Sequence, residues 1–201
     1  MHDEIVSTAD DAAGRACPCN PDAGRRQALK AATLVAFGAA IGLQPVRAAD
    51  TGPQPGDWLV EADDASMKPL DSGSLKVNQK QLIAWPYDPV AKAPRDGVRL
   101  NRIALIRLDP AAMDAATKAR SADGVLAYSA FCTHQGCDVS SWLPAEQAML
   151  CFCHFSKFAP LTEASVVGGP APRPLPALAL KVEDGKLVVA SGFNTPPGKA
   201  V

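Results

Sequence analysis

Two short stretches decide how this chain folds: Cys132-Thr-His134-Gln-Gly-Cys137 and, thirteen residues later, Cys151-Phe-Cys153-His154-Phe-Ser156. Each stretch contains two cysteines and one histidine. A packed apolar core does not require thiols and imidazoles in alternation, whereas metal ligation and disulfide formation both use these side chains. A structural zinc site with Cys and His ligands, or two surface disulfides with incidental histidines, would also be compatible with this stoichiometry.

The two stretches resemble the ligand loops of the Rieske iron–sulfur proteins. The resemblance implies a 2Fe–2S cluster, in which two thiolates bind one iron and two imidazoles bind the other. Cys132 and Cys151 then bind the inner iron, and His134 and His154 bind the outer one. Gly136 supplies the backbone freedom that a loop wrapped closely around a cluster needs.

The remaining cysteine pair, Cys137 and Cys153, is implied by the same resemblance to form a disulfide between the loops. Such a bond closes a loop of about sixteen residues, worth roughly 3 kcal/mol by the loop-closure argument. Beyond residue 48, the chain has four cysteines and two histidines, and all six lie in these two stretches. No thiol or imidazole is therefore left there for a second site.

The sequence around the loops predicts an all-β fold. Short β-rich runs occupy 81–85, 102–108, 124–129 and 148–150, and 111–120 has the composition of a short helix. Asp184-Gly185 separates two further apolar runs and predicts a β-hairpin. The resemblance implies a Rieske-type antiparallel β-sandwich base that carries a small cluster-binding subdomain, about 131–171.

A proline-rich run, 168–176, follows the second loop and resembles the loop that Rieske proteins fold over the cluster. Gly169, Pro170 and Pro172 are its candidate lid residues, although a proline run also suits a stiff linker. In cytochrome bc members the second loop reads C-P-C-H-G-S-x-Y. Its Ser hydroxyl donates a hydrogen bond to a bridging sulfide and its Tyr hydroxyl to a ligand cysteine sulfur, and both bonds raise the reduction potential. Here Ser156 matches, whereas Phe158 replaces the tyrosine.

The H-F-x-x-F form of residues 154–158 resembles the small subunit of arsenite oxidase, an exported molybdenum enzyme. The approach to the first loop, 127–134, resembles that family as well. In the second loop, Phe155 stands where the cytochrome bc members have glycine. Soluble Rieske ferredoxins lack both the extra cysteine pair and an export signal, so they match less well.

The N-terminal residues resemble a twin-arginine export signal. Arg25 and Arg26 precede an apolar stretch, 31–43, and small residues follow it. Thirteen apolar residues fall short of the ~20 that a membrane-spanning helix needs, so cleavage after residue 48 is favoured over retention as an anchor. The expected organisation is an export signal at 1–48, a Rieske domain at 49–193 and a disordered tail at 194–201.

Charge excludes one class of function. The formal net charge is −1, and no basic patch of the kind that binds nucleic acid is present. A cluster of cations is predicted to form a solvated face rather than a docking site: Lys92, Arg95, Arg99, Arg102 and Arg107.

The expected function is that of a periplasmic electron-transfer protein that is not a catalyst on its own and has no catalytic residue. The first interpretation is the Rieske subunit of an arsenite-oxidase-like complex, with a molybdenum-type large subunit as redox partner. The alternative is the iron–sulfur subunit of a quinol-oxidising cytochrome bc complex. That subunit would need a retained membrane anchor and His134 or His154 exposed to a quinol. A third interpretation, from another class, is a zinc-stabilised binding module.

Overall fold

The computed structural model describes residues 51–199. The predicted export signal, with Arg25 and Arg26, lies outside the described residues. Within 51–199, no helix is both long and apolar enough to cross a membrane.

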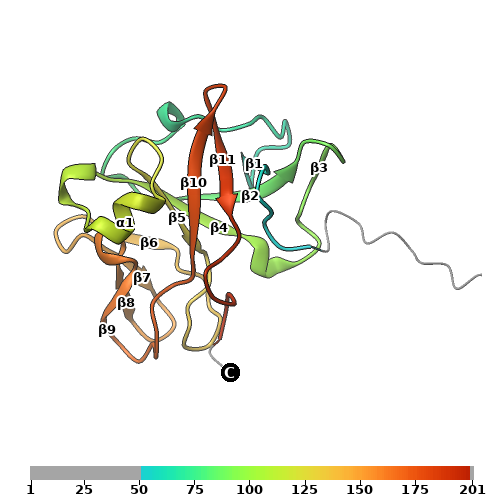
Figure 1. Ribbon diagram of the computed structural model, residues 1–201. Coiled ribbons are helices and arrows are strands. Elements are labelled where there is room, and N and C mark those ends of the chain that lie inside the picture. Colours follow the sequence, from blue (N-terminus) through green and yellow to red (C-terminus); the bar gives the residue numbers. More distant parts are fainter. Residues whose placement is uncertain (1–50, 200–201) are drawn as a thin grey trace, which may run out of the picture. The chain divides into compact units, whose positions relative to one another are not determined.

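A closed antiparallel barrel forms the base of the fold (Figure 1). Its sheet has the order β1-β11-β10-β5-β4-β2-β3, and β1 also pairs with β2, so six strands form a ring and β3 extends it at one side. The closure leaves the six strands without an open edge. The strands are β1 (Trp58–Glu61), β2 (Leu82–Asp88), β3 (Ala93–Pro94), β4 (Ile103–Arg107), β5 (Val125–Ser129), β10 (Ala177–Glu183) and β11 (Lys186–Ser191).

A second, smaller antiparallel sheet is inserted between β5 and β10. It has the order β6-β7-β8-β9, and both cysteine-rich stretches belong to this insertion. Its strands are β6 (Ser141–Leu143), β7 (Ala148–Cys151), β8 (Ser156–Ala159) and β9 (Ser165–Gly168). The remaining elements are α1 (Ala115–Arg120) and the 3-10 turns η3 (Ser72–Ser74), η4 (Arg99–Asn101), η5 (Pro110–Ala112) and η6 (Pro160–Thr162).

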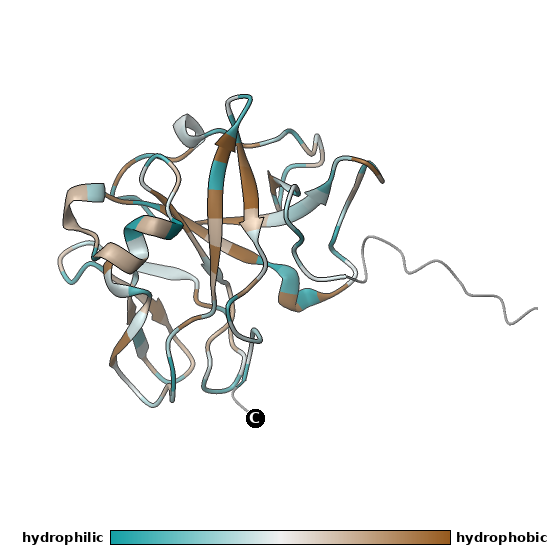
Figure 2. Cartoon of the chain, viewed as in Figure 1, coloured by the Kyte–Doolittle hydropathy of each residue, from teal (hydrophilic) through white to brown (hydrophobic). Residues whose placement is uncertain are grey.

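Successive side chains on a strand point to opposite faces of the sheet, so β4 and β5 each contribute to two separate apolar cores. On β4, Leu105 faces the barrel core, whereas the next residue, Ile106, joins the core between the barrel and the small sheet. On β5, Ala127 and Tyr128 divide in the same way. Figure 2 shows apolar residues concentrated along strands such as β4, β10 and β11, while many connections are hydrophilic. Both faces of β4 and β5 are therefore buried, which explains their nearly continuous apolar sequence.

The all-β prediction is confirmed, and so is the hairpin. Asp184 and Gly185 have φ angles of 49° and 74°, as a two-residue turn with positive φ at both positions requires. Residues 111–120 form η5 and then α1, where the Asp114 carboxylate accepts a hydrogen bond from the amide of Thr117 at 2.7 Å. The β-rich run expected at 81–85 continues through Pro86 to Asp88, because Pro86 still offers its carbonyl, which accepts a hydrogen bond from the amide of Arg95.

Two other expectations need correction. Arg95 does not belong to a solvated face: it is 7% exposed and pairs with the carboxylates of Asp57 and Asp88 at 2.6 and 3.1 Å.

Over the described residues 194–199, the tail expected to be disordered is held in place. Asn194 exchanges two hydrogen bonds with the backbone of Ala177, at 2.8 and 3.0 Å.

Candidate metal centre

The first cysteine-rich loop connects β5 to β6 and is closed by its own backbone. The amide of Cys132 donates to the carbonyl of Cys137 at 2.8 Å, and the amide of Gly136 donates to the carbonyl of Cys132 at 2.9 Å. Gly136 has a φ of 74°, the left-handed conformation that glycine adopts without strain. The loop is thus a compact turn that presents side chains at one end of the small sheet.

The second loop connects β7 to β8 and makes an equally sharp turn. Phe155 lies in its bend with a φ of 58°. A residue with a Cβ pays about 1–2 kcal/mol for this conformation, which accounts for the glycine found here in cytochrome bc members. The Phe155 side chain points outward and is 64% exposed.

The two loops bring the free thiols of Cys132 and Cys151 together in a buried site. These side chains are 2% and 1% exposed. Burial raises the pKa of the Cys151 thiol, and so does the neighbouring Cys132, whereas the backbone amides of Cys153 and His154 donate to this sulfur and lower its pKa. The pKa of Cys151 is raised overall, so the amides offset only part of the cost of forming the thiolate, which is the form that binds a metal.

The same loops pair the two imidazoles. The ring centroids of His134 and His154 are 4.6 Å apart, with the planes at 87°. Among the described residues, Nδ1 of His134 is buried and has no hydrogen-bond partner. A buried polar nitrogen without a partner is costly, and ligation by a metal would satisfy it. Thiol thus lies against thiol and imidazole against imidazole, the division that two differently ligated irons require.

The predicted disulfide is confirmed. Cys137 and Cys153 are bonded, with Cα atoms 6.5 Å apart and a sequence separation of 16. The sulfur of Cys151 lies within 4.8 Å of both disulfide sulfurs. Because bonded sulfurs are not available as thiolates, Cys151 is the one member of this group that could bind a metal.

Ser156 and Phe158, the two predicted tuning residues, are both fully buried on β8. The hydroxyl oxygen of Ser156 accepts a hydrogen bond from the amide of Ala171 at 3.2 Å. No acceptor for the hydroxyl proton is found among the described residues, so this proton is free to bond a cluster sulfur. Phe158 belongs to the apolar core that also contains Cys132 and Cys151, where a tyrosine hydroxyl would otherwise lie.

The proline-rich run packs onto the second loop. Gly169 has a φ of 79°, and a Cβ there would lie 2.5 Å from the Cα of Ser156. Ala171 is buried, while Pro170 and Pro172 are exposed. The hydroxyl of Thr133 donates to the carbonyl of Arg173 at 2.7 Å. The run therefore contacts both loops instead of behaving as a free linker.

Two hydrogen-bonding side chains that support the site, Arg99 and Tyr128, were not predicted from the sequence. The guanidinium of Arg99 donates to the carbonyl of Gly136 at 3.3 Å and lies 4.0 Å from the ring centroid of Phe131. The hydroxyl of Tyr128 donates to the carbonyl of Pro160 at 2.7 Å, and burial raises the pKa of Tyr128 well above its usual value. Arg99 belonged to the predicted cluster of cations, but the hydrogen-bond partners of Arg99 and Tyr128 could not be inferred from one sequence.

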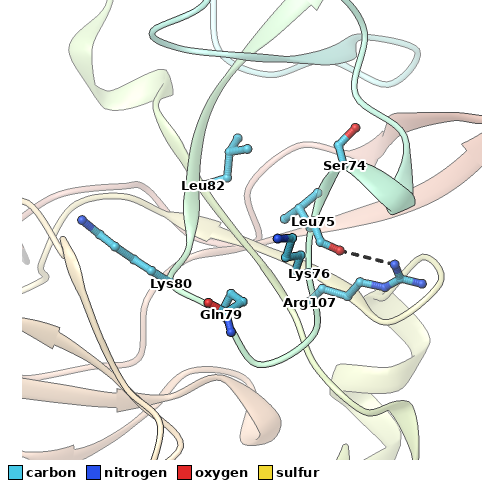
Figure 3. Close-up of a pocket in the computed structure, with 7 residues that line it drawn as sticks. All are labelled: Ser74, Leu75, Lys76, Gln79, Lys80, Leu82 and Arg107. Atoms are coloured by element: carbon cyan, nitrogen blue, oxygen red, sulfur yellow. Dashed lines mark hydrogen bonds between the residues drawn. The ribbon is translucent and has the colours of Figure 1, made fainter.

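A separate pocket of about 270 Å³ lies beside β2 and β4 (Figure 3). Arg107 closes one side by donating to the carbonyl of Leu75, and Lys80 extends away from Arg107. Its cations do not converge on one point, and no lining residue belongs to either ligand loop. The lining residues are Ser74, Leu75, Lys76, Gln79, Lys80, Leu82 and Arg107.

Comparison with known proteins agrees with the geometry. Residues 98–188 match the Rieske [2Fe-2S] domain family. A protein of Haloferax mediterranei named as a respiratory nitrate reductase subunit Rieske is 36% identical over 131 residues, covering 64% of this chain and 59% of the relative. The cytochrome bc1 complex Rieske iron-sulfur subunit of Streptomyces lividans is 39% identical over 98 residues, covering 48% of this chain and 58% of the relative.

The chain thus spans less than two thirds of the length of these two relatives. Among solved structures, a chain of "Hyperthermophilic respiratory Complex III" aligns with 24% identity and a TM-score of 0.46, over 82% of this chain and 89% of that chain.

Both ligand loops, the disulfide and the paired imidazoles fall within the matched residues. The match specifies an iron–sulfur cluster and displaces the zinc interpretation. Cys132, Cys151, His134 and His154 are the residues that would hold the cluster, because the structure offers two buried thiols and two paired imidazoles in adjacent loops. Residues 98–188 of this chain are therefore a Rieske [2Fe-2S] domain.

Proposed function

We propose that this protein is an exported electron-transfer subunit of a respiratory oxidoreductase complex. When bound, the cluster accepts and releases one electron at a time. The observation that carries the proposal is the separation of buried thiols from paired imidazoles, of which His154 is exposed. The imidazole edge faces the surface, so a donor or acceptor can approach there.

The protein's own residues control access and potential. Cys132 and Cys151 lie in the apolar core and keep water from the thiolate side. The amides of Cys153 and His154 donate to the Cys151 sulfur, and such bonds favour the more negative, reduced cluster. The lid residues Gly169, Pro170 and Pro172 cover the second loop in this proposal.

For the partner, we propose a molybdenum-type large subunit, as in an arsenite-oxidase-like complex in the periplasm. The H-F-x-x-F form of 154–158 supports this choice, and the similarity to a protein named as a nitrate reductase subunit supports an oxidoreductase complex. The alternative is a quinol-oxidising cytochrome bc complex, which the similarity to the bc1 subunit favours. In that case a quinol would meet the exposed His154.

Isolation of the natively expressed protein with its partners tests the proposal. We expect two irons and two labile sulfides per chain, and electron transfer to or from a co-purifying molybdenum subunit. A mature N-terminus near residue 49 and release with the periplasmic fraction would support export and cleavage. Retention in the membrane with cytochrome b would support the alternative. Failure to exchange electrons with either class of partner would refute the proposed function.

Ser156 is expected to raise the reduction potential, because its free hydroxyl proton can stabilise the extra negative charge of the reduced cluster. Ser156→Ala should lower the potential by several tens of millivolts, since a lost hydrogen bond of about 1 kcal/mol corresponds to roughly 45 mV for one electron. Protein-film voltammetry measures the shift. Exposed Ser140 offers the control Ser140→Ala, which should leave the potential unchanged.

Phe158→Tyr should raise the potential. Unchanged potentials in both Ser156→Ala and Phe158→Tyr would contradict the tuning roles.

A further inference from the structure

The residues after β11 return to the metal centre. In Figure 1 they run down from β11 to the end of the fold that carries the small sheet. Gly198 is buried with a φ of 88°, and a Cβ there would lie 3.1 Å from a methyl carbon of Leu100 in η4. The amide nitrogen of Lys199 lies 4.0 Å from the position of a Cβ on Gly136. Residues 194–199, hereafter the strap, therefore reach the first ligand loop.

Arg173 holds the strap in this position. Its guanidinium donates to the carbonyls of Pro196 and Gly198 at 2.7 and 3.2 Å, and to the hydroxyl of Thr195 at 3.3 Å. The rigid fork of an arginine suits several acceptors at once. Most of the strap is exposed, so it buries little apolar surface of its own and depends on these polar contacts.

The backbone of Arg173 meets the ligand loop directly. Its carbonyl accepts the hydrogen bond from Thr133, a fully buried residue between Cys132 and His134. One residue therefore links the strap, the proline-rich run and the peptide between two predicted ligands. Arg99 supports the same loop from η4 through the carbonyl of Gly136, so the loop is held at two points.

We propose that Arg173 is a positioning residue for the iron–sulfur centre, acting by holding the strap against the first ligand loop. With the strap in place, residues 132–137 keep the conformation that ligates the cluster, and water is kept from that flank. The inference deepens the proposed function and rests on it for the identity of the centre. It assigns the strap to the metal centre rather than to the stability of the barrel.

Hydrogen exchange on the cluster-loaded protein tests this role. Arg173→Ala, and a truncation that removes residues 195–201 while keeping Asn194, should each speed amide exchange in peptides covering 132–138 by about tenfold, as expected when a local opening becomes easier. Iron release to a chelator should become severalfold faster, and the electron paramagnetic resonance lines of the reduced cluster should broaden. Exchange in β4 and β11 should not change.

A double variant separates the strap from other roles of Arg173. If Arg173 acts through the strap, Arg173→Ala combined with the truncation should be no worse than either change alone. Arg173→Lys, which keeps the charge but loses the fork that reaches several acceptors, should restore only part of the protection. Lys181→Ala, an exposed charge on β10, is the matched control and should have no effect. Additive effects, or unchanged exchange in 132–138, would overturn the proposal.

The test is independent of the partner. If Arg173→Ala fails to fold, the truncation alone carries it, because removal of the strap leaves every residue of the two sheets intact. Wild-type protein that holds its cluster but exchanges no electrons would refute the proposed function, whereas the exchange comparison would still decide the role of Arg173.

Discussion

Cys151→Ala is expected to abolish the cluster. Cys151 is one of four predicted protein ligands, it is 1% exposed, and it is a free thiol in a site whose neighbouring cysteines, 137 and 153, are consumed by a disulfide. No spare thiolate can replace it. We expect iron and labile sulfide to fall close to zero and the electron paramagnetic resonance signal of the reduced cluster to disappear. The same loss is expected for Cys132→Ala, His134→Ala and His154→Ala.

Phe152→Ala is the matched control, because Phe152 follows Cys151 in the same loop but is 58% exposed and has no ligand atom. This variant should keep its full iron content. The ligand variants should also unfold more readily, since the binding free energy of a structural metal contributes to folding. A Cys151→Ala protein that retained iron and the native spectrum would disprove the ligand assignment.

The sequence was sufficient for the parts of the site that depend on local chemistry. The resemblance of the two cysteine-rich stretches to Rieske ligand loops predicted the disulfide and the two loops, and Asp184-Gly185 predicted the hairpin, because each signal lies within a few residues. Barrel closure could not be predicted in this way. Strand β1 has only four residues, and its pairing with both β2 and β11 joins distant parts of the chain.

The burial of Arg95 and the course of the strap were unpredictable for the same reason. Arg95 finds its main partner, Asp57, 38 residues away, and an arginine in a basic stretch gives no sign of such a partner. The strap is rich in proline and glycine, a composition typical of disorder. Arg173 donates hydrogen bonds that hold the strap in place, and strands β10 and β11 separate this arginine from the strap along the chain. A single sequence reports composition and spacing, whereas these features depend on long-range contacts.

Gly169→Ala is expected to displace the proline-rich run and to weaken cluster retention strongly. A Cβ at this position would lie 2.5 Å from the Cα of Ser156 and 2.7 Å from both the amide nitrogen of Ser156 and the carbonyl oxygen of Phe155. All three are backbone atoms, so no side-chain rotation can relieve the overlap. The left-handed φ of 79° adds about 1–2 kcal/mol for a residue with a Cβ, and overpacking adds about 1–3 kcal/mol.

The proline-rich run, 168–176, can relieve this overlap only by moving away from the second ligand loop. Ala171 would then lose its bond to the Ser156 hydroxyl, and that flank would be open to water. We expect a loss of about 2–5 kcal/mol in the free energy of unfolding, faster iron release to a chelator and a shifted reduction potential. Gly168→Ala is the control, because a Cβ there meets only the flexible side chain of Lys157 at 3.6–3.8 Å. If both variants lost iron at the wild-type rate, the run would not be the lid of this centre.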